Sequence, residues 1–286
     1  MGGLRIDAHQ HFWQPARGDY GWLTPELKPL YRDFGPTDLA PLMAATRIDR
    51  SIVVQAAPTI AETEFLLDLA AKTPSVAGVV GWAPLDASDA ARLVRGLAER
   101  PGLVGLRPML QDLPDDAWML RPELAPALLA MSQCGLAFDA LVKPRHLAAL
   151  LAFVDRYPEL RVVIDHGAKP AIPKAGKHWI GFDGWREAIA RLAERPQVFC
   201  KLSGLATEAM PGFAMSDLAP FAACLFDAFG PERVMWGSDW PVVTLATGYV
   251  EWHDAALGLV ESLSVSERVQ VFGGAAAAFY RLSQAP

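Results

Sequence analysis

The chain has 286 residues, of which 26 are Lys or Arg and 32 are Asp or Glu, so its formal net charge is −6. Hydrophobic residues make up 52% of the chain, which is typical of a globular protein and excludes disorder. The charges are scattered and form no basic run, so we predict no nucleic-acid partner. The length is compatible with two domains or with one α/β barrel.

The three cysteines, Cys134, Cys200 and Cys224, form no CxxC pair, and their odd number argues against a disulfide framework. The first residues lack the apolar core of a signal peptide, and no apolar run reaches the roughly 18 residues of a membrane span. We therefore predict a reduced cytoplasmic protein that has no membrane partner. An oligomer is compatible with the sequence.

Short apolar runs alternate with longer amphipathic patterns along the chain. The runs are mostly continuous, as expected of strands that are buried on both faces. The predicted strands are Leu4–Ala8, Ser51–Gln55, Val76–Trp82, Leu103–Arg107, Leu136–Val142, Arg161–Asp165, Val198–Leu202 and Arg233–Trp236. The predicted helices are one that Asp38 opens with N-cap chemistry, then Glu62–Lys72, Ser88–Glu99, Pro122–Gln133, Arg145–Arg156, Gly184–Glu194, Asp217–Phe229, Gly248–Ser262 and Ser266–Leu282.

Strand and helix alternate eight times, which favours a parallel sheet closed into a (β/α)8 TIM barrel, with one domain over residues 1–286. A doubly wound open sheet is the alternative. That fold usually carries a glycine-rich phosphate-binding turn after its first strand, where this chain instead has the segment 9–13, His-Gln-His-Phe-Trp. Two long loops, Phe12–Pro36 and Gly167–Asp183, follow the first and sixth predicted strands, and we expect them to form walls of an active-site pocket.

A barrel enzyme carries its reactive residues at the C-terminal ends of several strands. His9 and His11 follow the first predicted strand and are two residues apart, so on a strand both imidazoles point to the same face and share one cation or one substrate. Alone, this pair is equally compatible with one structural and one exposed histidine. Together with His166 and Asp239, which also follow predicted strands, it favours a functional site.

Asp239 lies in a Gly-Ser-Asp-Trp-Pro turn, where it serves either as a turn carboxylate or as a base that accepts a proton from water. Arg107 and Lys201 are cations near the ends of apolar strands. An unpaired buried charge costs several kcal/mol, so each is expected to face a polar ligand or a structural ion-pair partner such as Asp139 or Asp165.

Five segments together resemble the amidohydrolase superfamily, specifically its amidohydrolase-2 branch, and within that branch they are most similar to the sugar lactonase group that includes the L-fucono-1,5-lactonases. The order of these segments covers essentially the whole chain. The matching segments are Ile6–Trp13, Gly105–Pro108, Ile164–Pro170, Lys201–Gly204 and Trp236–Pro241.

This resemblance implies a (β/α)8 hydrolase whose central residues are His9, His11, His166 and Asp239, a set able to hold one divalent metal, zinc, at a single site. A binuclear site is not expected, because the seventh strand offers Lys201 where many amidohydrolases have a further histidine. The resemblance leaves open whether the metal is required for catalysis.

The implied reaction is hydrolysis of L-fucono-1,5-lactone or a related aldonolactone, with a small-molecule lactone as the partner. Asp239 is expected to activate water, with either His166 or the His9/His11 pair orienting its carboxylate. Arg107, Lys201 or a bound zinc is expected to stabilise the oxyanion. Lactonases of acidic aromatic-degradation products (4-sulfomuconolactone or 2-pyrone-4,6-dicarboxylate) and metal-dependent decarboxylases of the same superfamily are the alternatives. The expected substrate-binding residues are Trp13, Arg107, Lys143 and Trp240.

Overall fold

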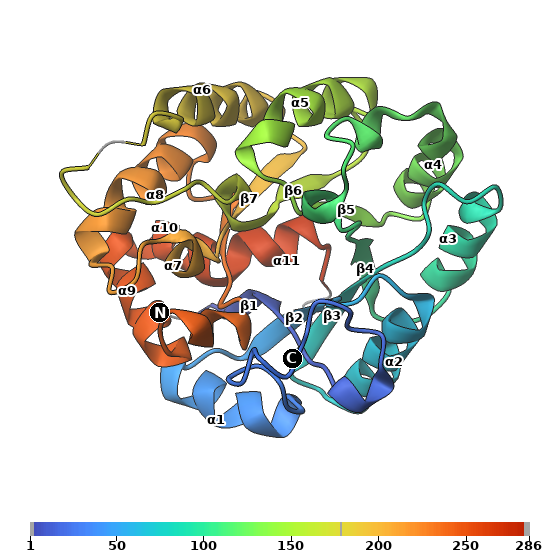
Figure 1. Cartoon of the computed structure of the whole chain (residues 1–286), viewed down its shortest axis with the longest axis horizontal. Helices are drawn as coiled ribbons and strands as arrows, with labels where there is room; N and C mark the ends of the chain where they lie inside the picture. The colour runs from blue at the N-terminus through green and yellow to red at the C-terminus, as the bar shows by residue number, and fades with distance from the viewer. Residues whose placement is uncertain (1–2, 178, 283–286) are drawn as a thin grey trace.

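The computed structural model describes residues 3–177 and 179–282. Eight parallel strands stand in the order β1 to β8 and are ringed by helices (Figure 1). The predicted (β/α)8 barrel is therefore confirmed over the open, doubly wound sheet. The strands are β1 (Ile6–Gln10), β2 (Arg50–Val54), β3 (Val76–Gly81), β4 (Leu103–Leu106), β5 (Ala137–Ala140), β6 (Val162–Ile164), β7 (Val198–Leu202) and β8 (Val234–Trp236).

The helices of the outer ring bury their apolar faces against the strands, as the amphipathic patterns predict. Within residues 3–177 and 179–282, none of them combines the length and the hydropathy that crossing a membrane requires. The ring consists of α1 (Pro36–Thr46), α2 (Ile60–Ala70), α3 (Ala90–Ala98), α4 (Ala125–Gln133), α5 (Leu147–Arg156), α6 (Phe182–Ala193), α8 (Met215–Phe229) and α9 (Tyr249–Leu259), and α7 (Leu205–Glu208) is a short helix after β7.

The C-terminal segment differs from the single helix predicted over Ser266–Leu282. The structure contains α10 (Val265–Val269), a π-helical stretch (Gln270–Gly274) and α11 (Ala275–Phe279). Apolar side chains of α11 pack against the inward-facing residues of the strands, and α11 lies across the centre of the ring in Figure 1. The prediction of one continuous helix was wrong, because an apolar pattern shows that a face is buried but neither where the helix is interrupted nor what covers it.

The first strand begins and ends two residues later than predicted. Because it ends at Gln10, His9 lies inside β1 and His11 lies directly after it. The barrel closes between β1 and β8 through backbone hydrogen bonds at their carboxyl ends. The amide of His11 donates to the carbonyl of Trp240 (2.7 Å), and the amide of Asp239 donates to the carbonyl of His9 (2.7 Å). The seam of the barrel therefore brings the histidine pair and the aspartate together.

Candidate active site

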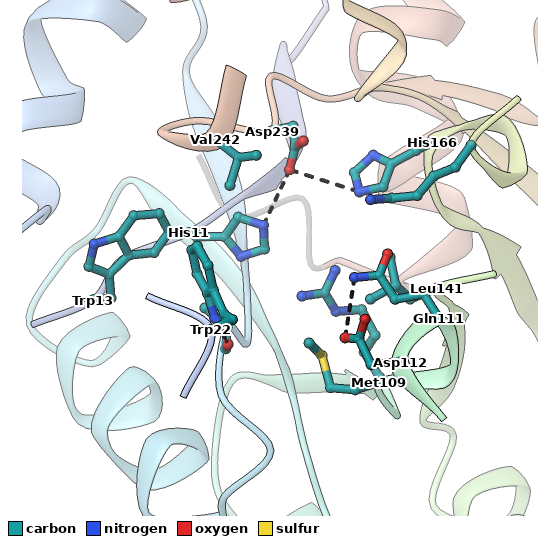
Figure 2. A pocket seen from close by; sticks show the side chains of 13 residues that line it. His11, Trp13, Trp22, Met109, Gln111, Asp112, Leu141, His166, Asp239 and Val242 are labelled. Atoms are coloured by element: carbon teal, nitrogen blue, oxygen red, sulfur yellow. Dashed lines mark hydrogen bonds and ion pairs between the residues drawn. The ribbon is translucent and has the colours of Figure 1, made fainter. Parts of the chain in front are cut away.

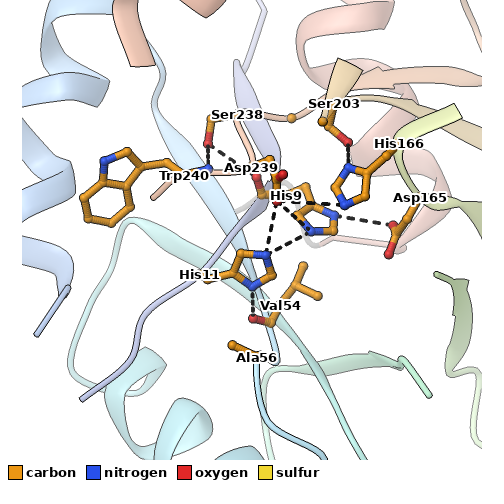
Figure 3. Close-up of polar contacts among 12 residues, drawn as sticks. His9, His11, Val54, Ala56, Asp165, His166, Ser203, Ser238, Asp239 and Trp240 are labelled. Carbon is orange, nitrogen blue, oxygen red and sulfur yellow. Dashed lines mark hydrogen bonds and ion pairs between the residues drawn. The ribbon is translucent and has the colours of Figure 1, made fainter. Parts of the chain in front are cut away.

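Three imidazoles and one carboxylate converge at the mouth of the barrel (Figure 3). The Nε2 atoms of His9 and His11 are 3.2 Å apart. Oδ1 of Asp239 lies 3.3 Å from His11 Nε2, 3.6 Å from His9 Nε2 and 3.8 Å from His166 Nε2. The structure therefore brings together all four residues that the sequence placed at the centre of the site.

The backbone at this site adopts conformations that side-chain-bearing residues rarely use. Asp239 (φ 56°) and His166 (φ 55°) both lie in the left-handed region, which costs about 1–3 kcal/mol per residue and is frequent at active sites. Two glycines supply the space: a Cβ at Gly204 would lie 2.5 Å from His166 Nδ1, and one at Gly237 would lie 2.7 Å from the Cβ of His9. The left-handed backbone at Asp239 and His166 and the close packing at Gly204 and Gly237 together direct the central side chains toward one point.

Hydrogen bonding and burial set the state of the groups at that point. His11 Nδ1–H donates to the carbonyl of Val54 (2.7 Å), which directs its Nε2 toward the other central residues. Burial lowers the pKa of His166 to about 4, so its ring is neutral at pH 7. Burial alone would raise the pKa of Asp239, but the interactions with His166, His11 and His9 outweigh it and hold the pKa below its usual value. Asp239 is therefore ionised.

This donor set fits a divalent metal such as zinc. Ligand atoms of His9, His166 and Asp239 all lie within 4.8 Å of one another. Ligands arranged tetrahedrally about zinc at about 2.0–2.1 Å are about 3.4 Å apart, close to the 3.6 Å and 3.8 Å that separate Asp239 Oδ1 from the Nε2 atoms of His9 and His166. Asp165 Oδ1 lies 3.4 Å from Nδ1 of His9, an arrangement that commonly supports metal-binding histidines.

Lys201 lies below the site rather than in contact with its open space, since its side chain is fully buried. Its Nζ is 2.6 Å from Asp139 Oδ2, 2.9 Å from Asp165 Oδ1 and 3.1 Å from His9 Nδ1. Tyr280, at the end of α11, also donates to Asp139 (2.6 Å). The ion pairs that the sequence offered as the structural alternative for Lys201 are thus present, and Lys201 contacts the four central residues through His9.

Three of the central residues, His11, His166 and Asp239, line a cavity of about 250 Å³ (Figure 2). Arg107 and Trp13 lie in its wall, where the sequence predicted substrate-binding residues. The guanidinium of Arg107 donates to the carbonyl of Gln55 and lies 3.5 Å from Asp165. The wall comprises His11, Trp13, Trp22, Ala56, Arg107, Met109, Gln111, Asp112, Leu141, His166, Lys169, Asp239 and Val242.

Two expected substrate-binding residues lie outside this wall. The ring of Trp240 packs against Phe34, with centroids 5.2 Å apart, and the residue is only 3% exposed. Lys143 precedes the short helix that starts α5, and its amide hydrogen-bonds His146 Nδ1 (2.9 Å). Both residues follow strand ends, but residues after a strand turn either toward the mouth or back into the outer ring, and spacing does not distinguish these directions.

The amidohydrolase family model matches residues 6–282. The chain belongs to the amidohydrolase family. It is 49% identical to the L-fucono-1,5-lactonase of Burkholderia ambifaria, over 98% of this chain and 97% of that protein. It is 41% identical to the L-fucono-1,5-lactonase of Burkholderia multivorans, over 99% of this chain and 98% of that protein. The predicted similarity to the sugar lactonase group is confirmed.

A crystal structure of an amidohydrolase from Burkholderia multivorans with bound zinc superimposes with a TM-score of 0.89 and 40% identity, covering 98% of this chain and 100% of that one. That relative shows that a protein of this family and fold binds zinc. In our amidohydrolase, the corresponding expectation rests on the buried His-His-Asp group.

Several residues of the amidohydrolase cavity were not singled out from the sequence. Met109, Gln111 and Asp112 come from the loop after β4, a few residues beyond Arg107, and Lys169 follows His166 by three residues. Their position just after strands that carry predicted site residues is the signal that points to them.

Glu62 is a supporting residue that the sequence did not reveal, because it lies in α2 rather than at a strand end. It is fully buried, and its Oε2 accepts hydrogen bonds from the amides of Ala56 (3.0 Å) and Ala57 (2.6 Å). Burial raises the pKa of Glu62 to about 7. The carboxyl group thus anchors the turn after β2.

That turn orients three functional side chains through three successive carbonyls. The carbonyl of residue 54 accepts from His11, that of residue 55 from Arg107, and that of residue 56 from the indole of Trp22 (2.7 Å). Because the amides of residues 56 and 57 are bound by Glu62, a single buried carboxyl group fixes the backbone that positions one central imidazole and two residues of the cavity wall.

Proposed function

We propose that this amidohydrolase hydrolyses an aldono-1,5-lactone, with L-fucono-1,5-lactone as the first candidate, to the aldonic acid. The observation that carries the proposal is 49% identity, over nearly the full length, to a lactonase of that sugar. The cavity supports it chemically. Trp22 offers an apolar face to the C–H surface of a sugar ring, and Gln111 and Asp112 offer hydrogen-bonding groups to its hydroxyls. Trp13, which is fully buried, packs edge-on against Trp22 with ring centroids 5.3 Å apart.

In the proposed reaction Asp239 is the base. Its ionised carboxylate removes a proton from water as the water oxygen bonds to the lactone carbonyl carbon. Arg107 lies in the same cavity and stabilises the negative charge that develops on the carbonyl oxygen. When the bond to the ring oxygen breaks, protonated Asp239 returns the proton to the leaving alkoxide. His166 packs beside the carboxylate, with its Nε2 3.8 Å from Asp239 Oδ1, and so limits the positions that the carboxylate can take.

We further propose that His9, His11, His166 and Asp239 hold one zinc ion. With four protein ligands, a bound zinc would activate water only if it accepted that water as a fifth ligand, and it would then lower the pKa of the water and reduce the demand on Asp239. Lys201 and Asp165 orient His9 from below, whether or not the ion is present. The sequence leaves the metal requirement open, and chelation separates the two cases.

The deciding experiment follows acid release in weak buffer from a panel of L- and D-aldonolactones, with and without chelator. We expect L-fucono-1,5-lactone to be hydrolysed and Asp239→Asn to lower turnover by at least about 10²-fold. Asp227→Asn, a change at an exposed aspartate of α8, is the matched control and should leave turnover unchanged. If no aldonolactone releases acid, the proposed function is wrong. Full activity in a sample shown by elemental analysis to be metal-free would exclude a required zinc.

The other reactions that the sequence left open have less support. The cavity wall balances Arg107 and Lys169 with Asp112 and Asp239, so it offers no excess of cations for a dicarboxylate or a sulfonate. Decarboxylases and 2-pyrone-4,6-dicarboxylate hydrolases among the solved structures are under 25% identical and show the fold alone. The cytoplasmic location, a possible oligomer and the single domain over residues 1–286 stay predictions.

A further inference from the structure

A second cavity, of about 550 Å³, adjoins the catalytic cavity. The two share Trp22, Met109 and Asp112 as lining residues, all three of which are visible in Figure 2. The second cavity extends from these residues over the loops that follow β2, β3 and β4. Those loops lie at the carboxyl ends of the strands, so the two cavities open on the same face of the barrel.

The chemistry of the second cavity differs from that of the first. Its wall holds three tryptophans from three different loops: Trp22 after β1, Trp82 after β3 and Trp118 after β4. Its acidic groups are Asp19, Asp86 and Asp112, and none of the described residues that line it is basic. The catalytic cavity, by contrast, contains Arg107 and Lys169.

Aromatic faces with carboxylate acceptors and no cations suit a neutral, polyhydroxylated ring. Such a ring stacks its C–H surface on tryptophan and donates its hydroxyl protons to carboxylates. The exposed carboxylates of Asp86 and Asp112 can accept such protons, whereas Asp19 Oδ2 already accepts from Arg17 (2.8 Å) and from the hydroxyl of Thr59 (3.0 Å). An anionic ligand would be repelled by the same wall.

We infer that the second cavity is a subsite for a sugar unit attached to the lactone, so that the enzyme accepts glycosylated aldonolactones. The lactone ring occupies the catalytic cavity beside Asp239, and the attached unit passes Trp22 and Met109 to rest between Trp82 and Trp118. This inference rests on the proposed lactonase function. It extends that function from a single sugar to a disaccharide-sized substrate.

The test compares L-fucono-1,5-lactone with its β-D-galactosyl derivatives at O2, O3 and O4 by pH-stat kinetics. We expect at least one derivative to show a kcat/KM at least 10-fold above that of the parent lactone, mainly through a lower KM. Trp82→Ala, which alters only the second cavity, should remove about 10-fold of that derivative's kcat/KM and change that of the parent by less than 2-fold.

Leu113→Trp replaces a wall residue by a larger one and so fills part of the second cavity, and it should reproduce the selective loss if Trp82→Ala does not fold. Hydrolysis of the parent but of no derivative would overturn the subsite and leave the lactonase intact. A lack of hydrolysis of every compound would overturn both. Binding of tetramethylammonium in calorimetry, with no preference for glycosylated lactones, would assign the aromatic, acidic wall to an organic cation and would also overturn the inference.

Discussion

Glu62→Ala tests whether one buried carboxyl group in α2 holds the substrate side of the site in place. The substitution removes the acceptor of two amides, those of Ala56 and Ala57. Each buried donor left without a partner costs about 1–3 kcal/mol, so the free energy of unfolding should fall by about 2–6 kcal/mol. The desolvation that raises the pKa of Glu62 to about 7 offsets part of this cost, which favours the lower half of the range.

The functional effect should exceed what the loss of stability alone would cause. Once the turn relaxes, the carbonyls that hold His11, Arg107 and Trp22 shift, and a displacement of about 1 Å in a positioning group costs roughly 10²-fold in rate. We therefore expect kcat/KM for the lactone to fall by about 10²-fold under conditions where urea titration shows the variant fully folded. Urea unfolding followed by circular dichroism gives the stability.

Glu64→Ala, at an exposed position of the same helix, is the matched control and should stay within about 0.5 kcal/mol of the wild type. Glu62→Gln keeps an oxygen that both amides reach, so it should retain most of the stability and activity. If Glu62→Ala matched Glu64→Ala in both unfolding and kcat/KM, the positioning role of Glu62 would be refuted.

The pH dependence of unfolding follows from the same residue. Folding raises the pKa of Glu62 from 4.5 to about 7. Between pH 4.5 and pH 7, Glu62 is therefore protonated in the folded protein and ionised in the unfolded chain. Its contribution to stability is therefore complete below pH 4.5 and is lost as the pH rises through 7, a change of about 3 kcal/mol. Glu62→Gln lacks this dependence, so the stability difference between it and the wild type should change across this window. A constant difference in urea unfolding from pH 4.5 to 8 would contradict the buried, protonatable state.

Two further substitutions probe the floor of the site. Lys201→Met leaves Asp139 and Asp165 buried without their cation, so unfolding should become easier by about 3–5 kcal/mol, whereas Lys72→Met, at an exposed lysine, should have no such effect in the same urea titration. Gly204→Ala places a Cβ 2.5 Å from His166 Nδ1 at a φ of 64°, so His166 must move. We expect kcat to fall at least 10-fold and the free energy of unfolding to fall by about 1–3 kcal/mol. Wild-type kinetics in this variant would show that the imidazole ring tolerates the added methyl group.

The barrel was predictable because its strands are buried on both faces and therefore appear as continuous apolar runs. The boundaries were less certain where such a run continues into polar site residues. The apolar pattern of the first strand is interrupted by Asp7 and His9. The strand nevertheless continues to Gln10, because both polar side chains are buried inside the barrel. Burial of polar groups at the mouth thus hides the end of a strand from a hydrophobicity pattern.

The convergence of the four central side chains was predictable because each lies in or soon after the carboxyl end of a strand, and the topology of a barrel brings all strand ends to one rim. The supporting residues were not. Glu62 is one of many glutamates on helices, and its role depends on the path of a turn that no spacing rule defines. Lys201 was correctly expected near a strand end, but whether its ammonium group faces the open cavity or the carboxylates below depends on Asp139 and on Tyr280, from distant parts of the chain.

The same backbone hydrogen bonds close the barrel and bring the residues of the site together. The bonds from His11 to Trp240 and from Asp239 to His9 join the first and last strands, and their side chains belong to the same convergent group. A change that loosens this seam therefore separates the histidine pair from the carboxylate by the same motion. The left-handed backbone at Asp239 costs free energy that the seam must offset, so the aspartate holds its position only while the barrel is closed. For this reason catalytic geometry and global stability should decline together for substitutions at the seam, and separately for substitutions in the loops that line the second cavity.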